Sequence, residues 1–309
     1  MALHTKDLLG LRGMPASVIT EILDAAAQLR PILDMNSKKT PHLTGKSIIT
    51  LFYENSTRTR MSFELASKYM SAASANISAS TSSVQKGETL IDTGRTLDRM
   101  GTDIIIIRHP MSGAPHLLSK HVKASVINAG DGINEHPTQA LLDLFTMRQT
   151  LGEIKGLRVA IVGDVLHSRV ARSNIFGLTA LGATVALAAP PTLLPQELDR
   201  LGVSVSTKVE DAISGADVVM ALRIQRERQA GGLFPSVAEY HRFFGINSAR
   251  MALAKPNAMV MHPGPMNRGV ELSSEVADCP QSVIDEQVTS GVAIRMALMY
   301  MLTRKGVSA

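Results

Sequence analysis

The sequence predicts an α/β fold with two doubly wound parallel-sheet domains that carry helices on both faces of each sheet. Short apolar runs alternate with helix-like segments along the whole chain, and this alternation is typical of parallel strands connected by helices. The chain has 309 residues, which is enough for two domains of ordinary size. Gly152 and Gly156 interrupt the alternation near its middle, so the domain junction is expected there.

The first half begins the alternation with two strong strand candidates. Apolar runs predict buried strands at Ser47–Tyr53 and Asp103–Ile107, and a weaker one at Val122–Asn128. The segment Ser71–Ser83 is rich in Ser and Ala and is expected to be a surface loop. Helices are expected at Glu21–Leu33, at Met61–Met70, at Gly94–Met100, and from Pro137 to about Thr150.

The second half repeats the pattern. A buried strand is expected at Leu157–Asp164, followed by a helix at Arg169–Leu181. Further strands are expected at Ala183–Ala188, Val218–Leu222 and Ala258–Met261. Polar clusters follow the strands, and ligands of open α/β sheets bind at the carboxyl ends of strands. These clusters come directly after Tyr53, Ile107, Gly163, Leu222 and Met261.

Composition favours a small anionic ligand over a nucleic acid. Hydrophobic residues make up 45% and charged residues 19% of the chain, as in ordinary globular proteins. The net charge of +5 is not gathered in Lys/Arg blocks, whereas a nucleic-acid binder concentrates basic residues in a stripe with aromatic residues. Single arginines beside Gly, Pro and hydroxyl residues suit a small anion better.

The sequence predicts neither a metal, nor a cofactor, nor a membrane partner. Cys279 is the only cysteine, which excludes an internal disulfide and a cysteine-based zinc cluster. The first seven residues lack an apolar signal region, and the apolar segment Val292–Leu302 contains Arg295 and is too short to span a bilayer. The expected location is the cytoplasm.

The segment Ser56–Arg60 combines three hydroxyl groups and two guanidinium groups between a strand and a helix. A helix N-terminus presents unpaired N–H groups and partial positive charge, and Arg adds a fork of donors that fits phosphate. The alternative is a capped helix start with two solvated arginines. The density of donors favours an oxyanion site, in which Arg60 braces the turn through Glu64 or Glu88.

Four other clusters are ambiguous when each is taken alone. Arg108 either caps the sheet or enters a cleft, and His136, one turn before Gln139, is either a helix cap or a site residue. Lys86 reads first as a solvated loop residue, and the loop from Arg223 to Arg228 as a charged surface loop. The segment His262–Gly269 is a turn made rigid by two prolines.

A dinucleotide site is disfavoured. Gly163-Asp164 ends a buried strand, but the Gly-x-Gly-x-x-Gly spacing of that site is absent.

Taken together, these motifs resemble the aspartate/ornithine transcarbamoylase family. The first half carries Ser56-Thr57-Arg58-Thr59-Arg60, Lys86-Gly87-Glu88-Thr89, Arg108-His109-Pro110 and His136-Pro137-Thr138-Gln139 in the family's order. The second half resembles the aspartate-specific members, because Arg223, Gln225 and Arg228 precede His262-Pro263-Gly264-Pro265. An ornithine-specific member is expected to carry a His-Cys-Leu-Pro turn and acidic residues for the amine.

The resemblance implies transfer of the carbamoyl group of carbamoyl phosphate to L-aspartate, a step of pyrimidine (UMP) biosynthesis. The implied catalytic residues are Arg58, Thr59, Lys86, Arg108 and His136. The implied carbamoyl phosphate ligands are Ser56, Thr57, Arg58, Thr59, Arg108, His136, Gln139, Gly264 and Pro265. The implied aspartate ligands are Lys86, Arg169, Arg223 and Gln225.

The resemblance also implies an oligomer and a domain plan. Ser82 (or Ser83) and Lys86 are expected to act in trans, so that a homotrimer shares its active sites. Residues 1–150, with a C-terminal helix at 287–309, form the expected carbamoyl phosphate domain, and 151–286 the aspartate domain, joined by two interdomain helices. A larger assembly with dihydroorotase or regulatory chains is an alternative to the bare trimer.

Two other functions remain open at the level of sequence. One is a transcarbamoylase for another amino acid, which would differ around Arg223–Arg228 and Gly264. The other is a catalytically silent subunit that serves as a scaffold. The intact set of basic site residues argues against the scaffold.

Overall fold

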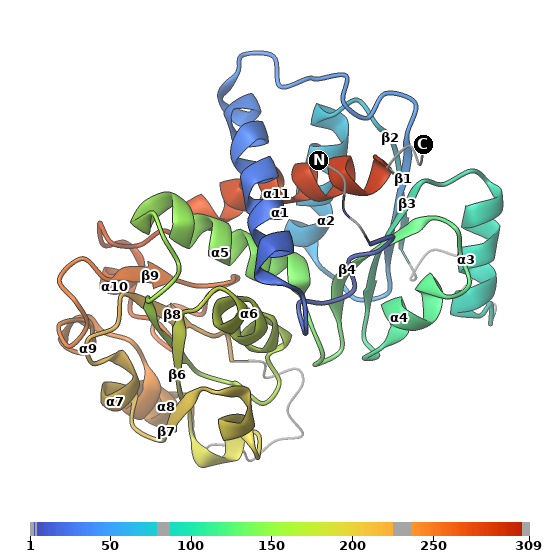
Figure 1. The fold of residues 1–309 in the computed structure, drawn as a ribbon. Coiled ribbons are helices and arrows are strands. Elements are labelled where there is room, and N and C mark those ends of the chain that lie inside the picture. The colour runs from blue at the N-terminus through green and yellow to red at the C-terminus, as the bar shows by residue number, and fades with distance from the viewer. Residues whose placement is uncertain (1–2, 4, 79–86, 225–235, 305–309) are drawn as a thin grey trace. The chain divides into compact units, whose positions relative to one another are not determined.

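The computed structural model describes residues 3, 5–78, 87–224 and 236–304. The chain forms two compact units, and each is described by itself. Unit 1 comprises Met1–Phe145 and Thr289–Ala309, and unit 2 comprises Thr146–Val288. Two helices, α5 (Pro137–Leu151) and α11 (Ile284–Thr303), each run from one unit into the other (Figure 1).

Unit 1 is built on a four-stranded parallel sheet in the order β2-β1-β3-β4. The central strand β3 contains Ile104–Ile107, whose four side chains are fully buried. Strands covered on both faces require such a continuous apolar run. The strand order reverses between β1 and β3, and ligands bind at the carboxyl ends of strands at such a reversal. The strands are β1 (Ser47–Phe52), β2 (Ala73–Ser78), β3 (Ile104–His109) and β4 (Ser125–Asp131).

The prediction of a surface loop at Ser71–Ser83 is wrong for its first part, because Ala73–Ser78 forms strand β2. This strand pairs in parallel with β1, and the Thr50 hydroxyl donates to Asn76 Oδ1 over 2.8 Å. An edge strand exposes much of its surface, so it needs no apolar alternation. Four of its six residues are exposed, which explains the Ser/Ala composition. Residues 79–83 lie outside the described part.

Helices α1, α2 and α3 match predicted segments with shifted ends, whereas the short α4 was not predicted. The early helix begins before Glu21 and gives way to a 3-10 turn at Arg30–Asp34, where Pro31 cannot continue the α-helical ladder. The helix around Gly94 begins earlier than predicted, because the Thr89 hydroxyl caps it by accepting from Asp92 N. The helices are α1 (Ala16–Leu29), α2 (Thr57–Tyr69), α3 (Leu90–Arg99) and α4 (Ala114–Ser119).

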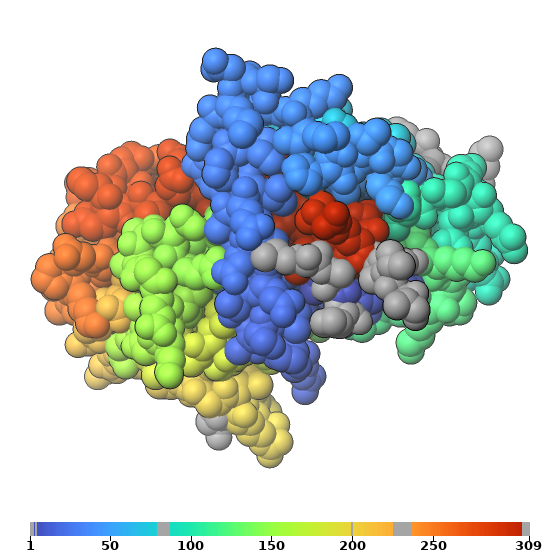
Figure 2. Space-filling model, turned by 45° about the horizontal axis from the view of Figure 1, so that its top comes forward, coloured from blue at the N-terminus to red at the C-terminus, as the bar shows by residue number. Residues whose placement is uncertain are grey.

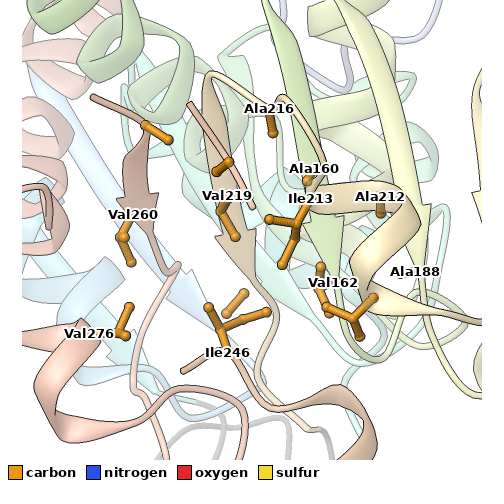
Figure 3. Close-up of a cluster of buried hydrophobic side chains, with 14 of the residues drawn as sticks. Ala160, Val162, Ala188, Ala212, Ile213, Ala216, Val219, Ile246, Val260 and Val276 are labelled. Atoms are coloured by element: carbon orange, nitrogen blue, oxygen red, sulfur yellow. The ribbon is translucent and has the colours of Figure 1, made fainter. Parts of the chain in front are cut away.

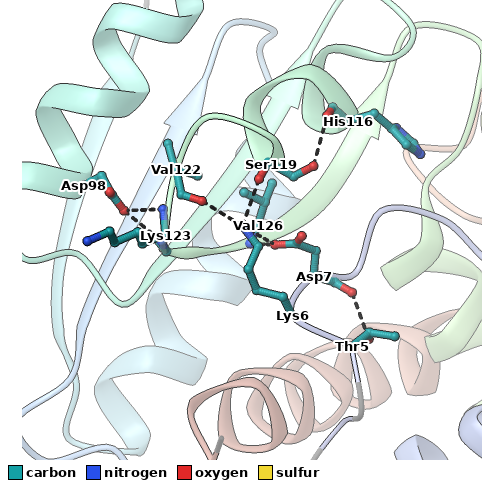
Figure 4. Close-up of polar contacts among 10 residues, drawn as sticks. Thr5, Lys6, Asp7, Asp98, His116, Ser119, Val122, Lys123 and Val126 are labelled. Atoms are coloured by element: carbon teal, nitrogen blue, oxygen red, sulfur yellow. Dashed lines mark hydrogen bonds and ion pairs between the residues drawn. The ribbon is translucent and has the colours of Figure 1, made fainter.

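The N-terminal segment attaches to the free edge of β4. Leu8 forms a parallel bridge with Ile127, and the Asp7 carboxylate accepts from Val126 N over 2.8 Å. The Lys6 ammonium donates to the carbonyls of Ser119 and Val122 over 2.9 and 2.8 Å (Figure 4). The segment therefore covers an edge that would otherwise leave backbone groups unpaired.

The C-terminal part of α11 is an interior element of unit 1. Residues from Ala293 to Leu302 are almost all buried, and Leu3 N donates to Met301 O. In the space-filling view this part of α11 is visible as a small red area beside blue N-terminal segments (Figure 2). Among the described residues, no helix combines the length and apolar character that crossing a membrane requires.

Unit 2 contains a five-stranded parallel sheet in the order β7-β6-β5-β8-β9, which reverses between β5 and β8. Val162, Val219 and Val260 lie in its core with Ile213 and Ile246 (Figure 3). The strands are β5 (Arg158–Val162), β6 (Thr184–Ala188), β7 (Ser204–Ser206), β8 (Val218–Ala221) and β9 (Met259–Met261). The helices are α6 (Arg169–Ala180), α7 (Val209–Ile213), α8 (Val237–Phe244), α9 (Ser248–Met251) and α10 (Ser274–Ala277). The predicted fold class, two parallel-sheet α/β domains, is confirmed.

Two neighbouring leucines of α4 test which side chains stabilise unit 1. Leu118 is fully buried in the core, whereas Leu117 is 45% exposed. Leu118→Ala leaves a cavity and is expected to lower the free energy of unfolding by about 2–5 kcal/mol. Leu117→Ala removes the same atoms from the surface and is expected to change it by about 0.5 kcal/mol at most. Urea unfolding of both variants measures the difference, and equal losses would contradict the packing described here.

Candidate active site

The segment Ser56–Arg60 lies where β1 ends and α2 begins. Ser56 is the N-cap residue in an extended conformation, but its side chain makes no capping hydrogen bond. The first turn of α2 therefore keeps its N–H groups unsatisfied by a cap, as an anion site at a helix N-terminus requires. Thr59 is buried, while Thr57 and Arg58 are exposed. Arg60 Nε lies 4.0 Å from Glu64 Oε1, in line with the predicted bracing role.

Arg108 is the last residue but one of β3 and lies near the start of this segment, because β1 and β3 pair with Phe52 opposite Arg108. Its side chain is mostly buried. Nη1 donates to Ala129 O over 3.3 Å, and Nη2 donates to Glu54 Oε1 over 2.8 Å. Glu54 supplies a carboxylate counter-charge within the site, and the sequence analysis did not identify it. Its position one residue after the apolar run was the available signal.

His136 and Gln139 belong to the start of α5, after β4. Both are buried, and Gln139 Nε2 donates to Asp143 Oδ1 over 3.0 Å. The loop before them is held by Asp131, a fully buried carboxylate that accepts from Gly113 N and Glu135 N over 2.7 and 3.1 Å. The sequence analysis missed Asp131 and Asp143, since a single buried carboxylate carries no distinctive spacing.

Two further polar rings lie at this edge of the sheet. Tyr53 and His109 have ring centroids 4.7 Å apart. Burial lowers the pKa of His109 from its ordinary value and raises the pKa of Tyr53. Both rings are therefore uncharged at neutral pH, and the positive charge of this edge comes from arginines.

Unit 1 thus gathers the predicted residues of its own half at one edge of its sheet. The Ser56–Arg60 segment follows β1, Arg108 is the last residue but one of β3, and His136 and Gln139 follow β4. All lie toward the carboxyl ends of parallel strands. Ser82, Ser83 and Lys86 lie outside the described residues.

In unit 2, the end of β5 approaches β8 closely. Gly163 has a φ of 132°, and a Cβ there would lie 2.9 Å from Leu222 Cβ. Only glycine accepts both the conformation and the contact. The fully buried Asp164 carboxylate then accepts from the backbone N–H of His167 over 3.1 Å. Nδ1 of the His167 ring lies 2.9 Å from Asp164 Oδ1. This arrangement fixes the turn that leads into α6.

Arg169 and Arg223 are the two predicted cations of unit 2. Arg169 is the first residue of α6 and is only 3% exposed, with Ser168 capping the helix. A buried cation at the positive end of a helix dipole is unfavourably placed and needs negatively charged or polar partners. Arg223 follows β8, the neighbour of β5, and is partly exposed. Gln225 and Arg228 lie outside the described residues.

The turn after β9 is organised by a buried His–Glu pair. Gly264 N donates to His262 Nδ1 over 2.9 Å, so this nitrogen carries no proton. The proton is therefore on Nε2, which donates to Glu271 Oε1 over 3.1 Å. The same carboxylate accepts from Asn267 N over 2.6 Å. The Gly264–Pro265 peptide bond in this turn is cis. The His262–Glu271 pair holds the turn through its hydrogen bonds with Gly264 N and Asn267 N.

No cluster of three or more His, Cys, Asp or Glu side chains suited to a metal ion occurs in the part of the chain that the structure describes. The arrangement within each unit is instead rich in donors and cations.

The fold and the two cationic sheet edges define a class, the two-domain α/β proteins that bind small anions. Residues 6–149 match the family model "Aspartate/ornithine carbamoyltransferase, carbamoyl-P binding domain", and residues 155–302 match the "Asp/Orn binding domain" of the same family. The chain belongs to the aspartate/ornithine carbamoyltransferase family. The sequence-based prediction of a transferase of this family is thereby confirmed.

Curated relatives resemble the chain over nearly its whole length. The aspartate carbamoyltransferase catalytic subunit of Ruminiclostridium cellulolyticum is 67% identical, covering 99% of this chain and 98% of the relative. That of Acetivibrio thermocellus is 65% identical, covering 99% and 98%.

Solved structures of both branches share the fold. Aspartate transcarbamoylase from Trypanosoma cruzi in complex with N-(phosphonacetyl)-L-aspartic acid has a TM-score of 0.87 at 31% identity, covering 96% of this chain and 95% of that one. Ornithine carbamoyltransferase from Pyrococcus furiosus has a TM-score of 0.86 at 30% identity, covering 97% and 98%. The backbone therefore does not separate the two branches.

The His262–Glu271 pair is expected to stabilise unit 2. Glu271→Leu leaves the His262 Nε2–H and Asn267 N–H groups buried without their acceptor, at a cost of about 1–3 kcal/mol for each group. Glu271→Gln keeps an oxygen acceptor and is expected to cost clearly less. Chemical unfolding followed by circular dichroism compares the two variants. Equal losses would show that the carboxylate acts only by filling space.

Proposed function

We propose that the protein is an aspartate carbamoyltransferase, which converts carbamoyl phosphate and L-aspartate to N-carbamoyl-L-aspartate and phosphate in pyrimidine biosynthesis. The observation that carries this proposal is the 67% identity, over 99% of the chain, to a protein named aspartate carbamoyltransferase catalytic subunit. The residue types at the two sheet edges support it independently, since both substrates are anions and both edges carry arginines.

Carbamoyl phosphate binds at the edge of the unit 1 sheet. Its phosphate accepts hydrogen bonds from the first turn of α2, from the hydroxyls of that turn and from Arg58. Thr59, Arg108 and His136 donate to the carbamoyl oxygen, and Gln139 contacts the carbamoyl nitrogen. The backbone around Gly264 and Pro265 contributes carbonyl groups to the same ligand. The phosphate ligands are Ser56, Thr57, Arg58, Thr59 and Arg108.

Aspartate binds through cations. Its two carboxylates need guanidinium or ammonium partners, which Arg169, Arg223 and Lys86 supply, with Gln225 assisting. Ornithine carries a cationic side chain and would need carboxylates instead. Charge complementarity therefore favours aspartate over ornithine, although the folds of the two branches are alike.

The reaction needs positioning and charge stabilisation more than a protein base. The aspartate amine attacks the carbamoyl carbon, and a C–N bond forms while negative charge gathers on the carbamoyl oxygen. Donors placed at that oxygen stabilise this charge. The C–O bond to phosphate then breaks with its electron pair on the phosphate oxygen, and the departing phosphate takes the amine proton. Holding both substrates in reacting geometry supplies much of the remaining acceleration.

The domain plan and the assembly complete the proposal. Residues 1–150 with the helix at 287–309 form the carbamoyl phosphate domain, and 151–286 form the aspartate domain. Three copies form a cytoplasmic homotrimer, in which Ser82 and Lys86 of one copy complete the active site of the next. Assembly with dihydroorotase or regulatory chains is an extension of the same trimer. The family match and the motif order support these statements.

A substrate panel tests the proposal directly. The purified protein is expected to release phosphate from carbamoyl phosphate with L-aspartate, and at least about a hundredfold more slowly with L-ornithine, because a buried charge mismatch costs several kcal/mol. Turnover with ornithine or another amine and none with aspartate would replace the proposed substrate. An inactive trimer with every amine would favour the scaffold.

Replacing Arg58 and Arg60 one at a time separates a role in phosphate binding from a role in bracing the turn. Arg58→Ala removes a phosphate donor and is expected to lower kcat by about 10²–10³-fold, the usual loss for one transition-state donor. Arg60→Ala removes the same type of group, whose nearest carboxylate is Glu64, and is expected to cost about tenfold or less. Steady-state kinetics measures both variants. A larger loss in the Arg60 variant would reverse the two roles.

A further inference from the structure

Two buried charged residues, Asp143 of α5 and Arg295 of α11, have no role in the proposed mechanism. Asp143 is fully buried on α5, one turn after Gln139. The Gln139 amide donates from Nε2 to Asp143 Oδ1 over 3.0 Å, within the interior of unit 1. Arg295 of α11 belongs to the same unit and is 4% exposed. Charged side chains are rarely buried without a partner, so the burial of Asp143 and Arg295 calls for an explanation.

Arg295 makes two contacts with α2 in the interior of unit 1. Its Nη1 donates to Ser62 Oγ over 2.8 Å, and its guanidinium lies 4.9 Å from the centre of the Phe63 ring. Gly291 leaves it room, because a Cβ there would lie 2.5 Å from Nη1. Burial lowers the pKa of Arg295 to about 10, and the charge of Asp143 opposes this change. The guanidinium is therefore still protonated at neutral pH.

The charge of Asp143 favours the protonated guanidinium of Arg295, and this attraction is mutual. An aspartate carboxylate accepts hydrogen bonds and donates none. A glutamine amide offers a donor at one end and an acceptor at the other. Because the carboxylate accepts only, the Gln139 nitrogen must face Asp143, and the amide is held in one of its two orientations. The other end of the amide, Oε1, is the part left to act on a ligand.

The carbamoyl group differs from an acyl group by a single feature, its –NH₂, and this group is a hydrogen-bond donor. An amide that presents oxygen can accept from it, whereas an amide that presents nitrogen would oppose donor to donor. A methyl group in the same place offers no hydrogen at all. The orientation of one side chain therefore decides whether the site can recognise a carbamoyl group.

We propose that Asp143, held by Arg295, is a positioning residue that fixes the Gln139 amide with its oxygen toward the carbamoyl –NH₂ and so selects carbamoyl phosphate over acyl phosphates. This inference rests on the proposed function, since it takes carbamoyl phosphate as the ligand of Gln139. The inference gives Asp143 and Arg295, which lie outside the family motifs, a role in substrate selection.

Two stable phosphonates of equal shape measure the selectivity. Phosphonoacetamide carries the –NH₂ group, and phosphonoacetone carries a methyl group in its place. Isothermal titration calorimetry on the intact protein is expected to give about tenfold tighter binding of the amide, the worth of one good hydrogen bond. In Asp143→Asn, the asparagine oxygen turns to Arg295 and its nitrogen to Gln139, so the Gln139 amide reverses. The ratio of the two affinities is then expected to fall to about one.

Three comparisons separate a positioning role of Asp143 from a purely structural role. Asp143→Glu keeps an acceptor-only partner and is expected to retain most of the preference. Thr138→Val changes a fully buried residue of the same helix without touching the amide and is expected to leave the ratio unchanged. Binding of inorganic phosphate, which has no –NH₂, is expected to be alike in all variants. If Asp143→Asn does not fold, the smaller Asp143→Ser carries the test, with the same loss expected.

The outcomes show separately whether the inference about Asp143 fails and whether the proposed function fails. A folded Asp143→Asn or Asp143→Ser protein that keeps the unmodified protein's ratio overturns the inference, and so does an unmodified protein that is active but shows no preference. An unmodified protein that does not turn over carbamoyl phosphate with aspartate overturns the proposed function instead. Loss of the ratio in Asp143→Asn, with phosphate binding and the Thr138→Val ratio unchanged, supports the inference.

Discussion

Parallel pairing at the reversal of strand order is the constraint on which the rest of the structure depends. In unit 1, β1 and β3 are neighbours whose connections run away in opposite directions, and in unit 2 the same holds for β5 and β8. Backbone leaves the sheet on opposite faces at these points, so side chains that follow the strands border a crevice. The Ser56–Arg60 segment, Arg108 and Arg223 all occupy such positions. Their chemistry is thus a consequence of topology.

The same geometry concentrates positive charge, which the two units handle differently. In unit 1 the Glu54 carboxylate offsets the charge of Arg108, whereas in unit 2 the positive end of the α6 dipole adds to the charge of the buried Arg169. In the proposed function, the phosphate and carboxylate groups of the substrates bind to these cations, and the interaction is strengthened because water is largely excluded from partly buried groups. The same positive charge repels a cationic amino acid, so selectivity between the two substrates needs no change of backbone.

The sequence predicted what depends on continuous or local patterns. The Ile104–Ile107 run identified a buried strand because both its faces are covered. The Ser56–Arg60 segment predicted an anion site because the donors are adjacent in the chain, and the structure places it at the start of α2. It failed at Ala73–Ser78, where an exposed edge strand depends on backbone pairing that leaves no apolar alternation. It also missed Glu54, Asp131 and Asp143. Buried carboxylates are recognisable only when the fold shows what donates to them.

The missed carboxylates show how recognition can depend on residues that never touch a ligand. A glutamine amide is nearly symmetric in shape, so packing alone cannot choose between its two orientations; only the hydrogen-bonding character of its neighbour can. In the proposed arrangement Asp143 makes that choice by accepting from Gln139 Nε2, and the charge of Arg295 favours a carboxylate there. Arg295 itself contacts Ser62 and Phe63 of α2, the helix that begins in the Ser56–Arg60 segment. Residues of α2, α5 and α11 thus contribute to one buried polar region within unit 1, and the choice of amide orientation is made there.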